Sequence, residues 1–404
     1  MIHGFKPLRY SDAAGSLQNL VSQPYDKIPP DEKARLEDAS PHNVVRLIRG
    51  ETSPDDTQWY AGVRPRVEAW LKEGVLVQDE TPSLYAYRQR FTAPDGTVHT
   101  RTGVTGVFDL AHEDKVLHHE RTHGRAKIDR LRLLEASEIH FGQIFLVRHE
   151  GPSLPVADLP DFESAPIVKD RDGAEHSFQR IENPDLVQGL EEAFASSGFV
   201  IADGHHRFTV ATQYAKDHPA SGGKQQVMVT VVDVDDPGLV VLPTHRLLSG
   251  LPTERTMGIL PFLQAVGAEP FPLLDDPTSF LEALRERGPG TVGVIARAGA
   301  FLWNLDLRGR EGVDALDTQR LDEDVITPLL RDLDIEDHLS YARDALQTIT
   351  KARSGEADLA FLLNPIPPRR VTDIAARGEL MPQKSTDFFP KMLTGFALQD
   401  MTRP

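Results

Sequence analysis

Two short stretches of the sequence combine residue types that could do chemistry. The first, HERTH (119–123), places His119, Glu120 and His123 in the H-E-x-x-H spacing. On a helix, this spacing puts two imidazoles one turn apart as zinc ligands and a carboxylate beside a metal-bound water. The second, DGHHR (203–207), joins a carboxylate, a glycine, two imidazoles and a guanidinium. The sequence therefore offers one candidate zinc site and one candidate anion site.

The DGHHR stretch stands between a predicted strand and a predicted helix. It follows the apolar run FVIA (199–202), and helical periodicity is clear from Phe208 onward. Gly204 permits a tight turn, so the next three residues open the helix. Free N–H groups and the helix dipole attract anions there. This predicts a phosphate-binding turn, with Asp203 placed to hold a metal or to orient a hydroxyl. A buried His pair with Asp203 as N-cap is the structural alternative.

The surroundings of HERTH do not favour a zinc protease. Gly124 follows the second histidine directly, and EDKVLH (113–118) shows no apolar face for a stable helix. Glu135 and Glu138 follow as acidic residues, but nothing singles out either as a third ligand. We therefore favour a catalytic loop that uses Glu120 without zinc. A polar surface loop and a zinc hydrolase are the alternatives.

The composition describes a globular chain and argues against several classes of protein. The 404 residues are 40% hydrophobic and 26% charged, and they include no cysteine, which excludes disulfides and thiolate metal sites. The net charge of -17 argues against nucleic acid and anionic membranes as partners. No apolar run is long enough to span a membrane, and the N-terminus lacks a signal-peptide pattern. We expect a cytoplasmic protein.

Hydrophobic periodicity and turn signals predict a mixed α/β fold around these stretches. Helices are expected at 31–39, 57–72, from 128, and at 187–197, 208–217, 254–266, 279–287, 316–330 and 341–353. Strands are expected at 43–49, 142–148, 199–203, 226–235, 238–248 and 358–365, with two more around Arg297 and a hairpin of 83–92 with 97–110. A linker with a small hairpin is expected at 150–185, and the tail 381–395 reads as irregular and polar. We divide the chain into an N-terminal α+β region (1–150), a central part (151–250) and a C-terminal α/β region (251–404).

Eight segments carry a resemblance to a known family: QPYDKI (23–28), HNVVRL (42–47), LYAYRQRF (84–91), HERT (119–122), KIDRLRLLEA (127–136), IADGHHR (201–207), DPGLVVLPTHR (236–246) and MPQKSTDFFPKMLTG (381–395). These segments extend over nearly the whole chain. In them the chain resembles the DUF1015 family, which is named for a domain of unknown function. The family pattern is H-E-x-T followed by K-x-D-R, so His123 is not part of it. Small departures at Lys27, Asp387 and Met392 remove no catalytic group.

The resemblance implies both a fold and an activity. DGHHR after a strand is similar to the phosphate-binding motif of the ParB/sulfiredoxin-like fold, which includes free serine kinases, so a ParB-like central part is expected. Members of the family resemble ATP-dependent kinases that convert L-serine to O-phospho-L-serine. The expected cofactors are ATP or ADP and Mg²⁺, and the expected partners are a nucleotide and a free amino acid. A ParB-like module that binds a nucleotide without catalysis is the alternative.

The kinase hypothesis gives each candidate residue a role. Phosphoryl transfer needs phosphate charge to be neutralised and a group that takes the hydroxyl proton. We expect Glu120 to be this base, and Asp203 to orient the acceptor or to bind Mg²⁺. Contacts to nucleotide or phosphate are assigned to Gly204, His205, His206, Arg207, Lys127, Arg130, Lys384, Ser385 and Thr386. Contacts to the substrate are assigned to Thr122, Thr244, His245, Arg246, Tyr25, Asp26 and His42.

Several of these residues have a structural alternative. The segment 244–246 follows an apolar run, so its histidine could be buried with the arginine on the surface. The segment 384–386 could be a solvated loop. His42 could cap the strand expected at 43–49. Phe388 and Phe389 are most simply core residues, although they could stack on an adenine.

Overall fold

The computed structural model describes residues 1–50, 57–120, 124–152, 154–219, 222–272 and 277–403. By its internal contacts the chain forms two compact units. The first comprises Met1–His118, Thr122–Val240 and Pro390–Pro404, and the second comprises His119–Arg121 and Val241–Phe389. Both units combine helices with sheets, so the mixed α/β class is confirmed. The three sequence-based regions stay a prediction.

The first unit is built on a nine-stranded sheet. Its strand order is β6-β11-β8-β12-β5-β4-β10-β9, with β1 also paired to β5. The strands are β1 (Ile2–His3), β4 (Tyr85–Thr92), β5 (Val98–Asp109), β6 (Val116–Leu117), β8 (Ile144–Glu150), β9 (Val168–Lys169), β10 (Glu175–Arg180), β11 (Gly198–Asp203) and β12 (Gln226–Asp233). The β6–β11 and β8–β12 pairs are parallel and the others are antiparallel. Two short ribbons complete the unit: β2 (Leu8–Tyr10) with β3 (Leu76–Gln78), and β7 (Ile139–His140) with β21 (Gln399–Asp400).

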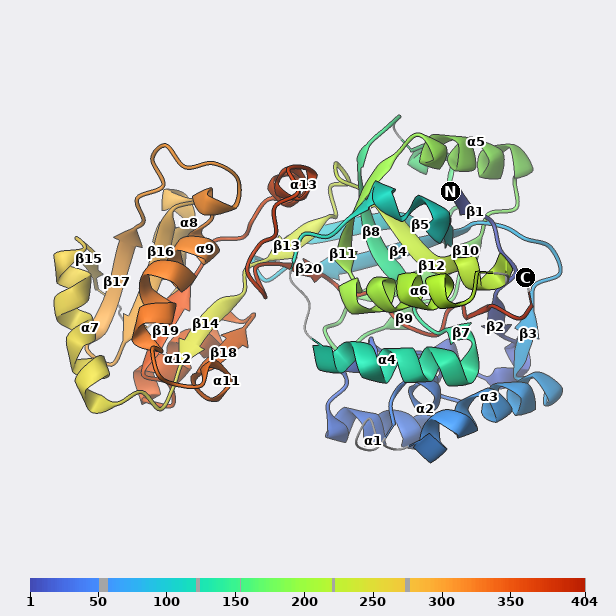
Figure 1. The fold of residues 1–404 in the computed structure, drawn as a ribbon, viewed down its shortest axis with the longest axis horizontal. Coiled ribbons are helices and arrows are strands. Elements are labelled where there is room, and N and C mark those ends of the chain that lie inside the picture. The colour runs from blue at the N-terminus through green and yellow to red at the C-terminus, as the bar shows by residue number, and fades with distance from the viewer. Residues whose placement is uncertain (51–56, 121–123, 153, 220–221, 273–276, 404) are drawn as a thin grey trace. The chain divides into compact units, whose positions relative to one another are not determined.

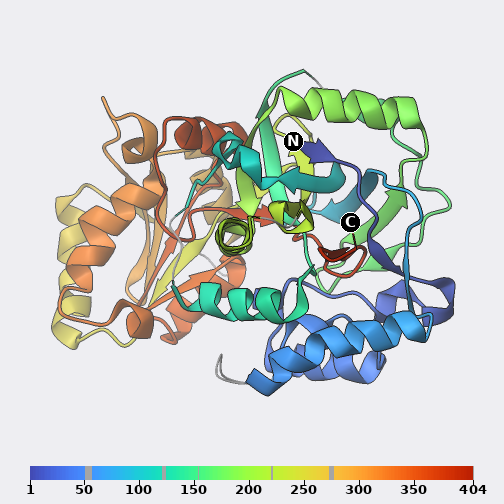
Figure 2. The same cartoon turned by 45° about the vertical axis from the view of Figure 1, so that its right-hand side comes forward.

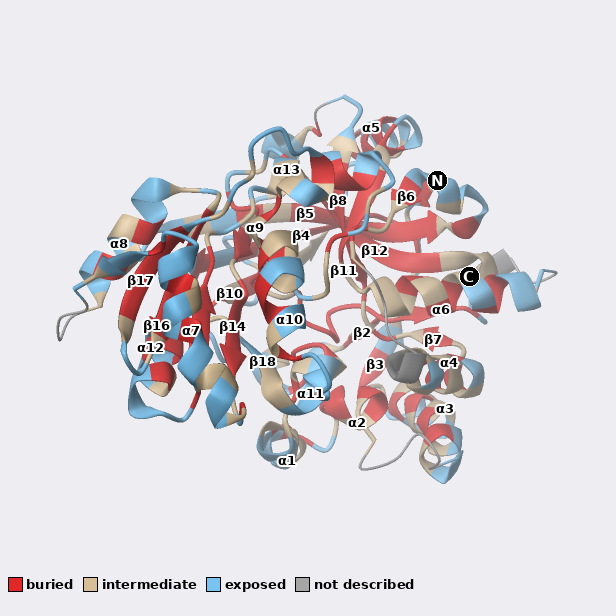
Figure 3. Cartoon of the chain, turned by 60° about the vertical axis from the view of Figure 1, so that its left-hand side comes forward, coloured by how far each residue is buried: buried red, intermediate tan, exposed pale blue. Residues whose placement is uncertain are grey.

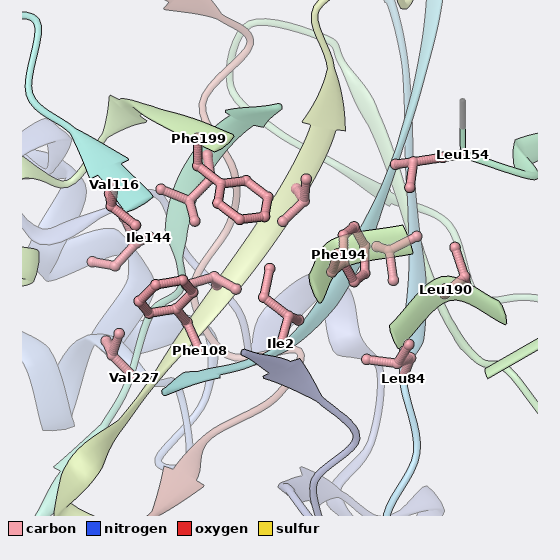
Figure 4. Packing of buried hydrophobic residues seen from close by; sticks show 14 of the residues in the cluster. Ile2, Leu84, Phe108, Val116, Ile144, Leu154, Leu190, Phe194, Phe199 and Val227 are labelled. Carbon is pink, nitrogen blue, oxygen red and sulfur yellow. The ribbon is translucent and has the colours of Figure 1, made fainter. Parts of the chain in front are cut away.

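The buried residues of the central strand β12 show that this sheet is covered on both faces. Residues 227–232 of β12 are all buried. Side chains alternate between the faces of a strand, so Val227 and Val229 join a cluster with Phe108, Phe194 and Phe199. Figure 4 shows Val227 with the three phenylalanines. Met228 joins a second cluster that includes Ala397. The segment near the C-terminus therefore covers a face of the sheet.

Helices surround the sheet of the first unit. They are α1 (Pro30–Ala39), α2 (Val45–Ile48), α3 (Thr57–Lys72), α4 (Gly124–Ser137), α5 (Pro184–Ala195) and α6 (His205–Asp217). The helix α4 packs against both α3 and α6 (Figure 1). Figure 2 shows α5 and α3 at opposite ends of the unit. The helix α3 buries Tyr60, Val63, Val67 and Trp70, and this spacing of three and four residues is the period from which the helix was expected.

The second unit contains a six-stranded sheet with helices. The strand order is β15-β17-β16-β19-β14-β18, and β13 (Val240–Leu242) pairs with β20 (Asp387–Phe389). The other strands are β14 (His245–Leu248), β15 (Glu269–Phe271), β16 (Thr291–Ala296), β17 (Gly299–Asn304), β18 (Leu339–Ala342) and β19 (Leu359–Leu362). The helices are α7 (Thr253–Ala265), α8 (Thr278–Arg287), α9 (Asp317–Leu321), α10 (Thr327–Leu329), α11 (Ile335–His338), α12 (Ala345–Ser354) and α13 (Pro368–Ala376), with a π-helical turn at Asp322–Ile326. Figure 3 shows the central strands buried and the outer side of α7 exposed.

Several sequence predictions of secondary structure are wrong. The run 43–49 is not a strand, because the Asn43 side chain accepts a hydrogen bond from the backbone N–H of Val45, and the short helix α2 follows. The run 238–248 forms two strands, β13 and β14, and Tyr341 belongs to β18 rather than to a helix. The segment 150–185 is more than a linker, because β10 joins the main sheet. The tail is buried at Phe388 and Phe389 and contains β20.

None of the helices in the described part of the chain is long and apolar enough to cross a membrane.

Candidate functional site

The DGHHR segment forms a tight strand-to-helix turn in the first unit. The strand β11 ends at Asp203 and α6 begins at His205. Gly204 between them has φ 98°, a left-handed conformation that glycine adopts without a steric penalty. A Cβ at this position would stand 3.0 Å from Nη2 of Arg207 and 3.2 Å from Cδ1 of Ile144. Glycine therefore allows both the turn and the close approach of the arginine.

Two cations clamp the Asp203 carboxylate. Arg207 Nη2 donates to Oδ2 at 2.7 Å, and Lys391 Nζ donates to Oδ1 at 2.8 Å. Burial alone would raise the pKa of Asp203, but Lys391 and Arg207 outweigh it and hold the pKa well below its usual range. Arg207 also donates through Nη1 to the backbone carbonyl of Gln143 at 2.6 Å. The turn thus holds one ionised carboxylate and two fixed cations beside the N-terminus of α6.

Lys391 is a residue of this site that sequence reasoning missed. The segment that carries it is fixed to the β4–β5 hairpin by three hydrogen bonds. Arg101 donates to the carbonyl of Pro390 at 2.6 Å, Gln89 donates to the carbonyl of Lys391 at 3.1 Å, and Tyr87 accepts from the Leu393 N–H at 2.8 Å. Lys391 stands 188 positions from Asp203 in the sequence. Its place in the segment 381–395, which carries part of the family resemblance, is the available signal, but the sequence prediction assigns the phosphate contact there to Lys384.

One histidine of the motif, His205, lies next to a further histidine. The ring of His205 is 5.6 Å from that of His118, centre to centre, and the His118 ring also contacts Phe208 edge-on. Burial and then the nearby charge of Lys127 lower the pKa of His118. Lys127 is half-buried in α4. The structure therefore brings His205 and Lys127, two of the predicted phosphate contacts, to one region of the first unit, while His206 is half-buried in the first turn of α6.

A small cavity of about 60 Å³ joins three of the predicted residues in the first unit. Tyr25, Arg130 and Arg207 all line it, and the Arg130 guanidinium stacks 3.9 Å from the centre of the Tyr25 ring. Burial raises the pKa of Tyr25, and the Arg130 and Arg207 charges oppose this. The cavity has room for a few water molecules rather than a nucleotide.

Two predicted substrate residues of the first unit lie apart from this cavity. Asp26 is exposed. The His42 ring packs edge-on against Trp70, and Nε2 lies 3.4 Å from a carboxylate oxygen of Glu73. Because 43–49 is not a strand, His42 does not cap one. His42 is therefore packed against Trp70 and lies close to the Glu73 carboxylate.

Glu120 belongs to the second unit and stands on a short backbone bridge. It pairs in parallel with Met381, and the Met381 N–H donates to the carbonyl of His119 at 2.8 Å. The His119 side chain is fully buried, with Nε2 2.9 Å from Oγ1 of Thr386 and the ring against Phe388. A buried imidazole with these contacts has a structural role, and this argues against His119 as a zinc ligand. Thr122 and His123 lie outside the described residues.

The segment 384–386 provides fewer accessible groups than its sequence suggests. Lys384 is exposed and has φ 57°. Ser385 is buried and donates to the carbonyl of Pro382 at 2.7 Å, while Thr386 contacts His119. Of the three, only Lys384 is exposed, and its contact to phosphate stays a prediction.

The segment 244–246 is buried in the sheet of the second unit. His245 accepts a hydrogen bond at Nδ1 from the Leu363 N–H at 3.2 Å. Burial, and then the Arg246 charge, lower the pKa of His245 to about 4. His245 lies in β14, an interior strand with neighbours on both sides, as in the structural alternative of a buried histidine, and its contact to substrate stays a prediction. Thr244 is also buried, and its carbonyl accepts from Arg246 Nη1 at 2.6 Å.

We expect His245 to make the second unit sensitive to acid. Its folded pKa of about 4 lies below the ordinary value of 6.5, so the unfolded chain binds the proton more readily. The contribution to the free energy of unfolding is complete above pH 6.5 and is lost as pH falls toward 4. Its size is ~3 kcal/mol, since one pKa unit corresponds to 1.36 kcal/mol.

An NMR titration of the His245 imidazole checks this prediction. Unfolding alone is a poorer test, because burial raises the pKa of Asp317 to about 6 in the same unit, and this works in the opposite direction. A midpoint near 6.5 for His245 would contradict the prediction.

The groups around Asp203 do not fit a protein-held Mg²⁺. Each of its carboxylate oxygens already accepts from a cation. Mg²⁺ prefers octahedral oxygen ligands, and among the described residues no three His, Asp or Glu side chains are placed to hold a metal ion. We therefore assign Asp203 to positioning of the two cations.

Comparison with known families gives one match. The sequence model of the family described as "Protein of unknown function (DUF1015)" matches residues 2–334. No curated protein matches the chain.

Comparison with solved structures gives several matches of low sequence identity. A free serine kinase variant with a replaced glutamate, in complex with AMP, is 14% identical with a TM-score of 0.40, and the alignment covers 72% of this chain and 92% of that one. A second variant of that kinase, in complex with ADP, is 13% identical with a TM-score of 0.39 and the same two coverages. C-terminally truncated SbnI from Staphylococcus aureus is 11% identical with a TM-score of 0.39, over 73% of this chain and 87% of that one.

Proposed function

Because the chain belongs to the DUF1015 family, we propose that it is a phosphotransferase that moves a phosphoryl group from ATP or ADP to the hydroxyl of a free amino acid, with L-serine as the first acceptor. The observation that supports this most is the cation pair at the α6 N-terminus. Arg207 and Lys391 are both held within 2.8 Å of one carboxylate beside the N-terminus of a 13-residue helix. Such a turn suits phosphate oxygens.

The proposed roles of the two carboxylates differ. Asp203 is bonded to two cations, and its depressed pKa makes it a weak base. Glu120 is half-buried in the second unit, where its backbone pairs with Met381. We therefore assign removal of the acceptor proton to Glu120 and positioning of Arg207 and Lys391 to Asp203. Joint action of Glu120 and the DGHHR turn in one reaction stays a prediction.

The phosphate contacts proposed from the sequence are retained with one addition. Backbone N–H groups of the first turn of α6, the side chains of His205, His206 and Arg207, and the ammonium of Lys391 would neutralise phosphate charge. Lys127 adds positive charge near His118. A metal ion in this scheme would arrive on the nucleotide phosphates, which is the usual mode for Mg²⁺.

The test is phosphoryl transfer by the purified chain with Mg²⁺, L-serine and either ATP or ADP, followed by detection of O-phosphoserine. We expect product with one of the two donors. Nucleotide binding, measured as thermal stabilisation, without product from L-serine, L-threonine or L-homoserine would favour the non-catalytic module. Absence of both product and nucleotide binding would overturn the proposal.

A further inference from the structure

The second unit buries one arginine whose charge is incompletely matched. Arg246 is fully buried in β14, and its strand register places it opposite Tyr341 of β18 and Phe361 of β19. Directly opposite residues share a face of the sheet, so the guanidinium lies in a row between two aromatic side chains. Its Cζ is 5.6 Å from the centre of the Tyr341 ring.

One edge of this guanidinium lacks hydrogen bonds. Nη1 donates to the Thr244 carbonyl, but Nε and Nη2 are buried and have no hydrogen-bond partner among the described residues. Asp322, at the start of the π-helical turn, lies 3.5 Å from Nε, and its Oδ1 also lacks a hydrogen bond within the part of the chain described. Buried charges normally form short, aligned hydrogen bonds, because leaving them unpaired is costly. The Nε–Nη2 edge of Arg246 is therefore incomplete.

The charged groups placed at this edge are the guanidinium of Arg246 and the carboxylate of Asp322. Asp322 is 27% exposed in its side chain, and burial raises its pKa against the opposing effect of Arg246. Burial also raises the pKa of Tyr341; the charge of Arg246 opposes this shift, and the charges of Asp322 and then Glu120 add to it. One guanidinium, one carboxylate and a phenol therefore lie together in the second unit.

We propose that the Nε–Nη2 edge of Arg246 binds the α-carboxylate of the amino-acid acceptor and that Asp322 binds its ammonium group. This rests on the proposed function and places the acceptor hydroxyl with Glu120. The Nε–Nη2 edge is the planar pair of donors that binds a carboxylate bidentately. The ligand replaces the loose contact to Asp322 and enters beside Asp322 and Tyr341, which is 39% exposed.

The balance of charge favours a zwitterion over a phosphate. A dianionic phosphate would meet the carboxylate of Asp322 and a single guanidinium, so the carboxylate would repel it. A free amino acid presents one negative and one positive group, and each has a partner of opposite charge here. The inferred substrate class is a small α-amino acid with a side-chain hydroxyl.

L-serine and two of its analogues test the carboxylate contact to Arg246 and the ammonium contact to Asp322 separately. L-serinamide keeps the ammonium and the hydroxyl of L-serine but lacks the carboxylate, whereas 3-hydroxypropionate lacks the ammonium. We expect wild-type kcat/KM for L-serine to exceed that for L-serinamide by at least ~10²-fold, since a polar site rejects an analogue that leaves its groups unpaired. Arg246→Lys should reduce this ratio to near one through KM for L-serine, with KM for the nucleotide unchanged. Asp322→Asn should instead reduce the preference for L-serine over 3-hydroxypropionate.

The control is Arg320→Lys. Arg320 belongs to the neighbouring α9 and pairs with Glu323 and Asp324, so this variant perturbs the same region without touching Arg246. Arg320→Lys should keep the wild-type preference for L-serine over both L-serinamide and 3-hydroxypropionate. Unchanged ratios in Arg246→Lys and Asp322→Asn, with both variants folded, would overturn the inference while leaving the kinase proposal intact.

Isothermal titration calorimetry of L-serine binding tests the inference even if the protein shows no phosphoryl transfer. We expect the wild type, with or without ADP, to bind L-serine at least ~10-fold more tightly than Arg246→Lys, as expected for loss of one charge-assisted pair. If Arg246→Lys does not fold, the same comparison is made with Asp322→Asn. Failure of the wild type to bind L-serine in the presence and in the absence of ADP would overturn the inference.

Discussion

Replacing Glu120 by glutamine is expected to lower kcat for O-phosphoserine formation by about 10²- to 10⁴-fold, the range that general-base catalysis contributes. Glutamine keeps the size of the side chain but does not accept the hydroxyl proton. KM for L-serine and for the nucleotide should change little. The fold should also be retained, because the bridge to Met381 is made by the backbone. Kinetics of the purified variant, together with its thermal unfolding, measure both effects.

The matched control is Glu135→Gln. Glu135 is an exposed glutamate on α4, so its replacement removes the same charge without touching the Glu120 segment. It should retain wild-type kcat. Wild-type kcat in Glu120→Gln would show that another group takes the proton. Equal loss in both variants would show that the effect comes from net charge.

The second large effect, a loss of affinity for ADP, is expected from Arg207→Lys. The guanidinium spans two acceptors, Oδ2 of Asp203 and the carbonyl of Gln143, and a lysine ammonium does not reproduce this planar geometry. We expect about 10- to 100-fold weaker binding of ADP, since a charge-assisted hydrogen bond is worth about 1.5–3 kcal/mol. Isothermal titration calorimetry measures the affinity directly.

Arg171→Lys provides the comparison for this variant. Arg171 is an exposed arginine in the turn between β9 and β10 of the same unit, so the chemical change is identical and the site is not involved. Its affinity for ADP should match that of the wild type. If Arg207→Lys also binds ADP normally, the DGHHR turn is not the phosphate site.

The elements of the fold that follow a clear period were predictable from the sequence. The hairpin around APDG appears as β4 and β5, and α3 has the predicted bounds of 57 and 72. The prediction of a strand at 43–49 is wrong because a short apolar run fits a buried strand and a helix equally well. The side chain of Asn43 decides between them, since it satisfies the backbone N–H of Val45 and starts a helical turn.

The candidate site was predictable only where its residues are close in sequence. The turn at 203–207 is local, because a glycine and a helix start determine it. The contact between Lys391 and Asp203 joins distant segments through the packing of the tail on the β4–β5 hairpin, and no local pattern encodes it. Burial of Arg246 likewise depends on β18 and β19 pairing on either side of β14, which periodicity in β14 does not reveal.

The division of the first unit into separate stretches of chain has a consequence for biosynthesis. A ribosome makes residues 1–240 long before 390–404, yet the latter stretch supplies Lys391 and β21 to the same unit. Because domains tend to fold as soon as their residues emerge, the nascent first unit must wait for 241–389 to be translated. The lysine that completes the clamp on Asp203 arrives last. The growing polypeptide therefore acquires its proposed phosphate site only after residues 241–389 have been made, when the second unit has had time to fold.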